Sequence, residues 1–265
     1  MPSKKISRQD ITQALVSALE PLQFVQAMWE AGAAAFDRID SWSDIDIMVV
    51  AEDDKVDQVL ALIDETLSGL SPIDIRFELP RPTWHGHVQV FYRLQNASQF
   101  MLVDLVILKR SSENRFLEPE IHGRPHVFFD KIEFTQPPEF DADVFLQRLR
   151  ERVEYLKVTF DLYQVLVLKE VGRLNWIEAL SFYYGFSLRP LVELLRIRYC
   201  PQRYNFNTRY IHYDLPLEAV TELEALYFVR NGEAILDKQR QVQEWFQREI
   251  DSLQWEQVEA KLGAG

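Results

Sequence analysis

The hydrophobic period of this chain changes near residue 137, and this change narrows the folds that the chain can adopt. Before residue 137, short apolar runs alternate with polar positions or are separated by turn residues, which is typical of strands. After it, apolar residues recur every three or four positions, which is typical of packed helices. We therefore predict an α+β protein, in which a mixed-sheet domain over residues 1–136 precedes an all-α helical bundle over residues 139–265. Residues 135–138, Thr-Gln-Pro-Pro, are expected to link the two.

Individual elements can be assigned along most of the chain. Residues 110–136 carry few periodic signals, so a loop or lid is expected there. The strands just before that segment should form an antiparallel meander with helices on one face. In the first part we expect, in chain order, a helix at 8–20, a strand or helix end at 24–28, a strand at 45–50, a helix at 55–70, and strands at 73–79, 88–94 and 101–108. In the second part we expect helices at 145–167, at 176–199 with an interruption at Pro190, at 217–229 and at 234–255.

Acidic side chains outnumber basic ones. Lys and Arg total 29 while Asp and Glu total 41, so the formal net charge is −12 at pH 7. Nucleic-acid binding depends on basic side chains that displace counterions from the phosphates. Because this chain is acidic, we expect small or cationic partners and not nucleic acid. The single cysteine, Cys200, excludes an intrachain disulfide and a cysteine-rich zinc site, which suits a reducing, cytoplasmic location. Since no run approaches about 18 apolar residues, no membrane partner is expected.

Two aspartates open the strand expected at residues 45–50. Asp44 and Asp46 are two positions apart, and on a strand this spacing puts both side chains on one face. Ile45 and Ile47 then point to the opposite face. Two carboxylates so placed repel each other unless a cation lies between them. Mg²⁺ is the ion expected there, because it takes oxygen ligands from a few carboxylates and from substrate phosphates.

A third aspartate, Asp104, lies in the middle of an apolar strand, where an unpaired carboxylate is costly. A sheet that places Asp104 beside Asp44 and Asp46 would create a site for one or two Mg²⁺ ions. Such ions would orient a nucleoside triphosphate, activate an acceptor hydroxyl and stabilise the pyrophosphate leaving group. An isolated Asp-x-Asp is more often a solvated turn, so the expected metal site depends on Asp104 sharing a sheet face with the other two.

On these residues the chain resembles the nucleotidyltransferase fold superfamily, which is related to DNA polymerase beta. The family pattern is Gly-Ser or Gly-Gly on a helix, then Ser-Asp-hydrophobic-Asp, then hydrophobic-Asp-hydrophobic on a later strand. This chain has Gly32-Ala33, Ser43-Asp44-Ile45-Asp46 and Val103-Asp104-Leu105 in that order. The strand pattern and the helical C-terminal half are most similar to the aminoglycoside adenylyltransferases. Ala33 departs from the family pattern, in which the second small residue is usually Ser or Gly.

The resemblance implies that the chain moves a nucleoside monophosphate from an NTP to a hydroxyl of a small molecule such as an aminoglycoside, releasing pyrophosphate. ATP is the expected donor and Mg²⁺ the expected cofactor, held by the catalytic residues Asp44, Asp46 and Asp104. The helical bundle would bind the acceptor, in a cleft between the domains. Two alternatives stay open: a protein-adenylylating or antitoxin-like nucleotidyltransferase, and a catalytically degenerate protein that only binds nucleotide.

Further residues are candidates for contact with substrate. Asp74 and Glu78, on the polar face of their strand, are either solvent-exposed or a general base for the acceptor hydroxyl. His85 and His87 have either a structural role or a contact with the nucleotide. The candidates for nucleotide binding are Gly32, Ala33, Ser43, Arg124 and Lys131.

Five arginines cluster among aromatic residues in the helical half. They form either a solvated face that pairs with acidic groups or a site for triphosphate or substrate. The cluster consists of Arg189, Arg196, Arg198, Arg203 and Arg209.

Overall fold

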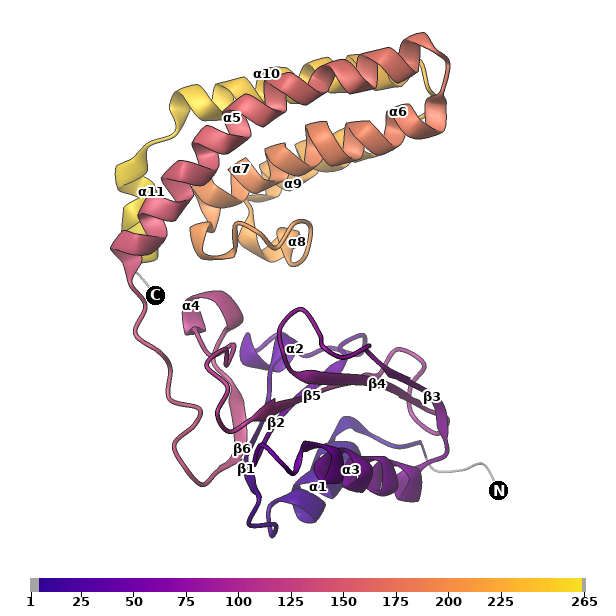
Figure 1. Ribbon diagram of the computed structural model, residues 1–265. Helices are drawn as coiled ribbons and strands as arrows, with labels where there is room; N and C mark the ends of the chain where they lie inside the picture. Colours follow the sequence, from indigo (N-terminus) through magenta and orange to yellow (C-terminus); the bar gives the residue numbers. More distant parts are fainter. Residues whose placement is uncertain (1–4, 264–265) are drawn as a thin grey trace. The chain divides into compact units, whose positions relative to one another are not determined.

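The structure is a computed structural model that describes residues 5–263 (Figure 1). The chain divides into two compact units, Met1–Glu139 and Phe140–Gly265. A mixed sheet occupies the first unit and helices make up the second, so the predicted α+β class is confirmed. No helix within residues 5–263 has the length and apolar character needed to cross a membrane.

Six strands of the described chain form one sheet in the order β3-β4-β5-β2-β1-β6. Neighbouring strands are antiparallel except β2 and β5, which run parallel to each other. The predicted meander of β3, β4 and β5 is therefore present, and the parallel pair joins it to the rest of the sheet. The strands are β1 (Val25–Glu30), β2 (Ile45–Ala51), β3 (Ile73–Glu78), β4 (Val88–Leu94), β5 (Leu102–Lys109) and β6 (His126–Asp130).

One face of the sheet carries the main hydrophobic core. Helices α1 (Arg8–Leu19) and α3 (Val56–Leu70) lie against that face, as Figure 1 shows. Alternate residues of β2 and β5, such as Ile47 and Leu105, pack there against Leu15 and Ile63. Ser7 and Asp10 form a capping box that starts α1. The opposite face carries a smaller cluster, in which Met48 and Val106 pack with Trp29, Leu117 and Phe134.

The segment expected to be a loop, residues 110–136, contains two regular elements. A short helix, α4 (Pro119–His122), is followed by β6, which pairs antiparallel with β1 at the edge of the sheet. The loop prediction is therefore wrong for His126–Asp130. This five-residue run lacks a clear alternation, and its strand conformation comes from the hydrogen bonds that β1 offers. A further short helix, α2 (Gly32–Ala35), connects β1 to the loop before β2.

The second unit is a bundle of helices, as predicted. Pro190 does not split a helix in the way expected. The chain instead changes from α-helix to a π-helical segment at Tyr183–Leu188, and Pro190 stands in the first turn of the next α-helix, where its missing N–H is tolerated. The helices are α5 (Ala142–Gly172), α6 (Trp176–Phe182), α7 (Arg189–Tyr199), α8 (Ile211–Asp214), α9 (Leu217–Tyr227), α10 (Ala234–Ser252) and α11 (Trp255–Leu262), with a 3-10 turn at Pro201–Arg203.

Members of the arginine cluster pair with acidic groups inside this unit. Arg196 is fully buried, and its Nη1 lies 2.9 Å from Oδ2 of Asp214, which is equally buried. Arg203 adds a second contact to Asp214 at 2.7 Å, and Arg198 binds Glu249 at 2.7 Å. The expected pairing with acidic groups is therefore present for these three arginines, but the expected solvated face is wrong for Arg196, which is buried inside the bundle.

Candidate active site

Asp46 and Asp104 lie directly opposite each other in the parallel ladder of β2 and β5. Register partners on adjacent strands point to the same face of a sheet. Met48 and Val106, two positions further along, belong to the cluster on the face away from α1 and α3. Both carboxylates therefore lie on that second face, and both are half-buried.

Asp44 continues the same line one step before β2 begins. Its Oδ1 accepts the backbone N–H of Leu102 at 3.4 Å, and Leu102 stands two positions before Asp104. Asp44 is exposed, so its carboxylate lies at the open end of the row. The structure thus brings the three predicted carboxylates to one pair of neighbouring strands.

The row of carboxylates is not a closed metal cage. Within residues 5–263, no group of three His, Cys, Asp or Glu side chains converges closely enough to hold a metal ion. Mg²⁺ rarely needs such a cage, because it commonly takes one or two carboxylates and completes its shell with substrate phosphates and water. Asp46 and Asp104, on adjacent strands and on one face, fit that donor set.

Gly32 makes room for the carboxylate of Asp46. A Cβ built on Gly32 would lie 1.8 Å from Oδ2 of Asp46, and Gly32 adopts φ +56°, a conformation that side chains disfavour. The N–H of the preceding residue, Ala31, donates to the carbonyl of Asp46 at 2.9 Å. Gly32 and Ala33 begin α2, so both predicted motif residues lie beside β2. Gly32 therefore contributes the space that lets the backbone of α2 approach the Asp46 carboxylate closely.

Arg8 fixes the loop that leads into β2, a role that sequence reasoning missed. Its guanidinium donates to the carbonyls of Ser43 and Asp44, at 2.9 and 2.5 Å, and also binds the carboxylate of Glu30. Glu30 is buried in β1, and this burial raises the pKa of its carboxyl while Arg8 acts against the rise. One arginine thus ties α1, β1 and the Asp44 loop together.

Gln89 holds Asp104, and it too was not among the predicted site residues. Its Nε2 donates to both carboxylate oxygens of Asp104, at 2.8 and 3.0 Å. Its Oε1 lies 3.1 Å from Nε2 of His85, and Nδ1 of His85 accepts the backbone N–H of His87 at 3.1 Å. This pattern assigns the proton of a neutral His85 to Nε2. No sequence spacing marks Gln89, because its role depends on the pairing of β4 with β5.

Two predicted phosphate contacts end up in different places. Arg124 is exposed and lies beside α2, where its N–H donates to the carbonyl of Ala35 at 2.9 Å. Lys131 lies at the far end of β1, where its Nζ donates to the carbonyls of Leu22 and Val25 at 2.8 Å. Val25 pairs with Ala51, at the opposite end of β2 from Asp46, so Lys131 is not part of the carboxylate site.

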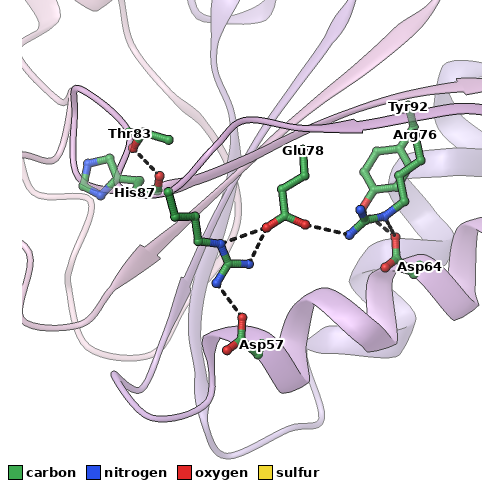
Figure 2. A network of polar contacts seen from close by, with 8 residues as sticks. Asp57, Asp64, Arg76, Glu78, Thr83, His87 and Tyr92 are labelled. Atoms are coloured by element: carbon green, nitrogen blue, oxygen red, sulfur yellow. Dashed lines mark hydrogen bonds and ion pairs between the residues drawn. The ribbon is translucent and has the colours of Figure 1, made fainter.

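The candidate general bases are engaged in ion pairs with arginine side chains. Glu78 pairs in register with Val90, a residue of the main core face, and so points to the side of the sheet that carries α3. Figure 2 shows its carboxylate between arginine side chains, with Asp57 and Asp64 of α3 nearby. Asp74 binds Arg93 at 2.5 Å. Glu78 is therefore not placed to serve the same face as Asp104, whereas Arg93, the partner of Asp74, pairs in register with Leu102 on the Asp104 face.

Ser43 serves the backbone of its own loop. Its Oγ donates to Oδ1 of Asp40 at 2.9 Å and accepts the N–H of Asp40 at 2.9 Å. The hydroxyl therefore holds the turn that precedes Asp44.

Comparison with known proteins adds a structural likeness. No protein-family model matches this chain, and no curated protein matches it in sequence. Among solved structures, one match is a STING-associated CdnE c-di-GMP synthase from Capnocytophaga granulosa. The two share 16% sequence identity over 92% of this chain and 80% of that chain, with a TM-score of 0.32. A similarity this low identifies neither the fold nor the function of this chain, so the site residues alone support the proposal below.

Proposed function

We propose that this protein is a Mg²⁺-dependent nucleotidyltransferase, which moves a nucleoside monophosphate from an NTP to an acceptor hydroxyl and releases pyrophosphate. The observation that carries the proposal is the register of Asp46 and Asp104, which puts two carboxylates on one face of adjacent parallel strands with Gly32 against the first. An arrangement that concentrates negative charge on a half-buried sheet face is stabilised by a divalent cation.

The three aspartates and Gln89 would each have a role in the reaction. Asp44, Asp46 and Asp104 would hold Mg²⁺, which when bound neutralises the phosphates and polarises the attacked phosphorus. The acceptor oxygen would attack the α-phosphorus, the bond from that phosphorus to the bridging oxygen would break, and pyrophosphate would leave. Asp104, oriented by Gln89, would either complete the metal site or accept the proton of the acceptor hydroxyl. Positioning and charge neutralisation would then supply most of the rate.

The proposed donor and acceptor complete the reaction. ATP is the proposed donor, and the proposed acceptor is a hydroxyl of a small cationic molecule such as an aminoglycoside, which suits a chain with a net charge of −12. The helical unit is proposed to bind that acceptor. A protein that binds nucleotide without transferring it is the second candidate, because Ala33 replaces the hydroxyl or glycine of the family motif.

Release of pyrophosphate tests the proposal directly. The full chain would be incubated with each NTP, Mg²⁺ and a panel of hydroxyl acceptors that includes aminoglycosides, and labelled NTP would report transfer. We expect metal-dependent release that Asp46→Asn and Asp104→Asn abolish. Asp54→Asn is the matched control, because Asp54 is an exposed carboxylate outside the site. Nucleotide binding without release in any combination would favour the second candidate.

A further inference from the structure

We infer that Trp42 and Phe100 form a stacking platform for the nucleobase of the donor nucleotide. The inference rests on the proposed function, because it assigns the base-binding part of the same site. The two rings come from loops far apart in the sequence, and their centroids lie 4.5 Å apart at an interplanar angle of 56°. Trp42 is nevertheless 65% exposed and Phe100 43% exposed. Large aromatic side chains are usually buried, so two that meet at the surface mark a binding surface.

The platform continues the register of the carboxylates. Asp46 pairs with Asp104. Two positions earlier on each segment, Asp44 accepts the N–H of Leu102. Two positions earlier again, the ring of Trp42 contacts the ring of Phe100. Each ring therefore precedes its carboxylate by four residues, a separation of at most about 14 Å along the chain. A nucleoside triphosphate can span that interval, with its phosphates at the carboxylates and its base on the rings.

Local hydrogen bonds order the backbone that carries both rings. The N–H of Trp42 donates to Oδ1 of Asp40 at 2.8 Å, and this bond is the main reason that the pKa of the Asp40 carboxyl lies below its usual range. Arg8 holds the carbonyls of the next two residues in this loop. On the other segment, the N–H groups of Phe100 and Met101 donate to Ser98. A platform that is ordered before binding loses little entropy when a base stacks on it.

The chemistry around the rings favours a neutral planar group. Asp40 and Asp44 flank the platform, so an anionic ligand would be repelled there unless a metal ion accompanied it. A nucleobase is neutral, and it stacks on aromatic rings whatever its identity. Trp84 offers a contrast, since it is 87% exposed and its ring meets that of His85 at a near-perpendicular angle of 83°.

Calorimetric titration of the full chain with a non-hydrolysable ATP analogue and Mg²⁺ tests the inference. Trp42→Ala and Phe100→Ala should each weaken binding by about 5- to 150-fold, the range expected when a stacked base loses its aromatic partner. Trp42→Phe should stay close to wild type because it keeps a ring. Trp84→Ala should bind like wild type. Inorganic tripolyphosphate with Mg²⁺, which has no base, should bind wild type and Trp42→Ala equally.

The outcomes separate this inference from the proposed function. Analogue binding that is unchanged in Trp42→Ala and Phe100→Ala would overturn the platform and leave the nucleotidyltransferase proposal standing. A loss of affinity for the acceptor alone, with unchanged affinity for the analogue, would have the same meaning. An equal loss of tripolyphosphate binding in Trp42→Ala would show that the ring only supports the loop, which also overturns the inference. A wild-type chain that binds no analogue with Mg²⁺ would overturn both.

Discussion

Gly32 lies directly against the carboxylate of Asp46. The space that a Cβ would occupy on Gly32 is filled by Oδ2 of Asp46, only 1.8 Å from the Cβ position. Gly32 also holds φ +56°, in the left-handed region. The residue that starts α2 and the residue that faces Asp104 across the ladder are thus fitted to one another, although 14 positions separate them in the sequence (46 − 32).

This contact predicts that Gly32→Ala damages activity more than stability. The left-handed conformation costs a side-chain-bearing residue about 1–2 kcal/mol, and the new methyl group would also push the Asp46 carboxylate out of place. Urea unfolding should therefore show a modest loss of stability, while pyrophosphate release falls to background. Gly69→Ala is the control, because a Cβ at Gly69, inside α3, would meet no described atom within 4 Å. That variant should gain about 0.5–1 kcal/mol. Wild-type activity in Gly32→Ala would contradict the assigned role of Asp46.

The hydrogen bonds from Gln89 to Asp104 predict that substitution of Gln89 changes the dependence of activity on Mg²⁺. Gln89→Ala removes both hydrogen bonds to Asp104, so the carboxylate loses its fixed orientation. Partners of metal ligands usually matter about 10- to 100-fold for metal affinity or activity. We expect the Mg²⁺ concentration for half-maximal activity to rise by that order. Gln13→Ala, at an exposed position of α1, should leave it unchanged. A Gln89→Ala variant that is less stable but has the wild-type Mg²⁺ dependence would reduce Gln89 to a packing role.

The sequence predicted the carboxylates because strand periodicity reports which face a side chain occupies. Ile45 and Ile47 alternate with Asp44 and Asp46, and the apolar run around Asp104 marked a second strand in the same way. The fold class and the order of the elements followed from the same periodicity. What periodicity cannot supply is the pairing of one segment with another.

The errors and omissions at the site all depend on such pairing. β6 forms because β1 offers it an edge, and His126–Asp130 lacks a clear alternation of its own. Gln89 meets Asp104 only because β4 lies beside β5. Lys131 has a suitable charge for a phosphate contact and Glu78 a suitable carboxylate for a general base, yet the sheet places Lys131 at the wrong end and Glu78 on the wrong face. Charge and residue type could not reveal those positions.

His87 predicts how stability depends on pH. Its side chain is buried, and Nε2 has no hydrogen-bond partner among the described residues. Burial, with a smaller contribution from neighbouring His85, lowers the pKa of His87 below its ordinary value of 6.5. The unfolded chain therefore binds a proton at a higher pH than the folded chain does, and stability falls as the pH drops below that value.

Urea unfolding at about pH 7.5 and about pH 5.5, on either side of the ordinary histidine pKa, measures this effect. Wild type should lose more stability between the two conditions than His87→Gln does. His212→Gln, which removes an exposed histidine of the helical unit, should behave like wild type. Equal pH dependence in wild type and His87→Gln would contradict the burial argument.

The buried pair of Arg196 and Asp214 predicts a large effect of substitution on the stability of the helical unit. Both side chains are fully buried, and Arg196 also donates to the carbonyls of Asn207 and Arg209. Asp214→Asn leaves the guanidinium in the interior without its counter-charge, which typically costs about 3–5 kcal/mol. Asp237→Asn breaks an exposed pair with Arg240 and should cost less than about 1 kcal/mol. Similar losses in the two variants by urea unfolding would contradict the structural role of this cluster.

Diffraction from crystals soaked with Mn²⁺ and a non-hydrolysable ATP analogue tests the central claim most directly. The account predicts anomalous density for an ion with oxygens of both Asp46 and Asp104 at about 2.0–2.2 Å, and with phosphate oxygens of the analogue completing its shell. A nucleotide bound elsewhere on the protein, or an ion that contacts neither carboxylate, would contradict it.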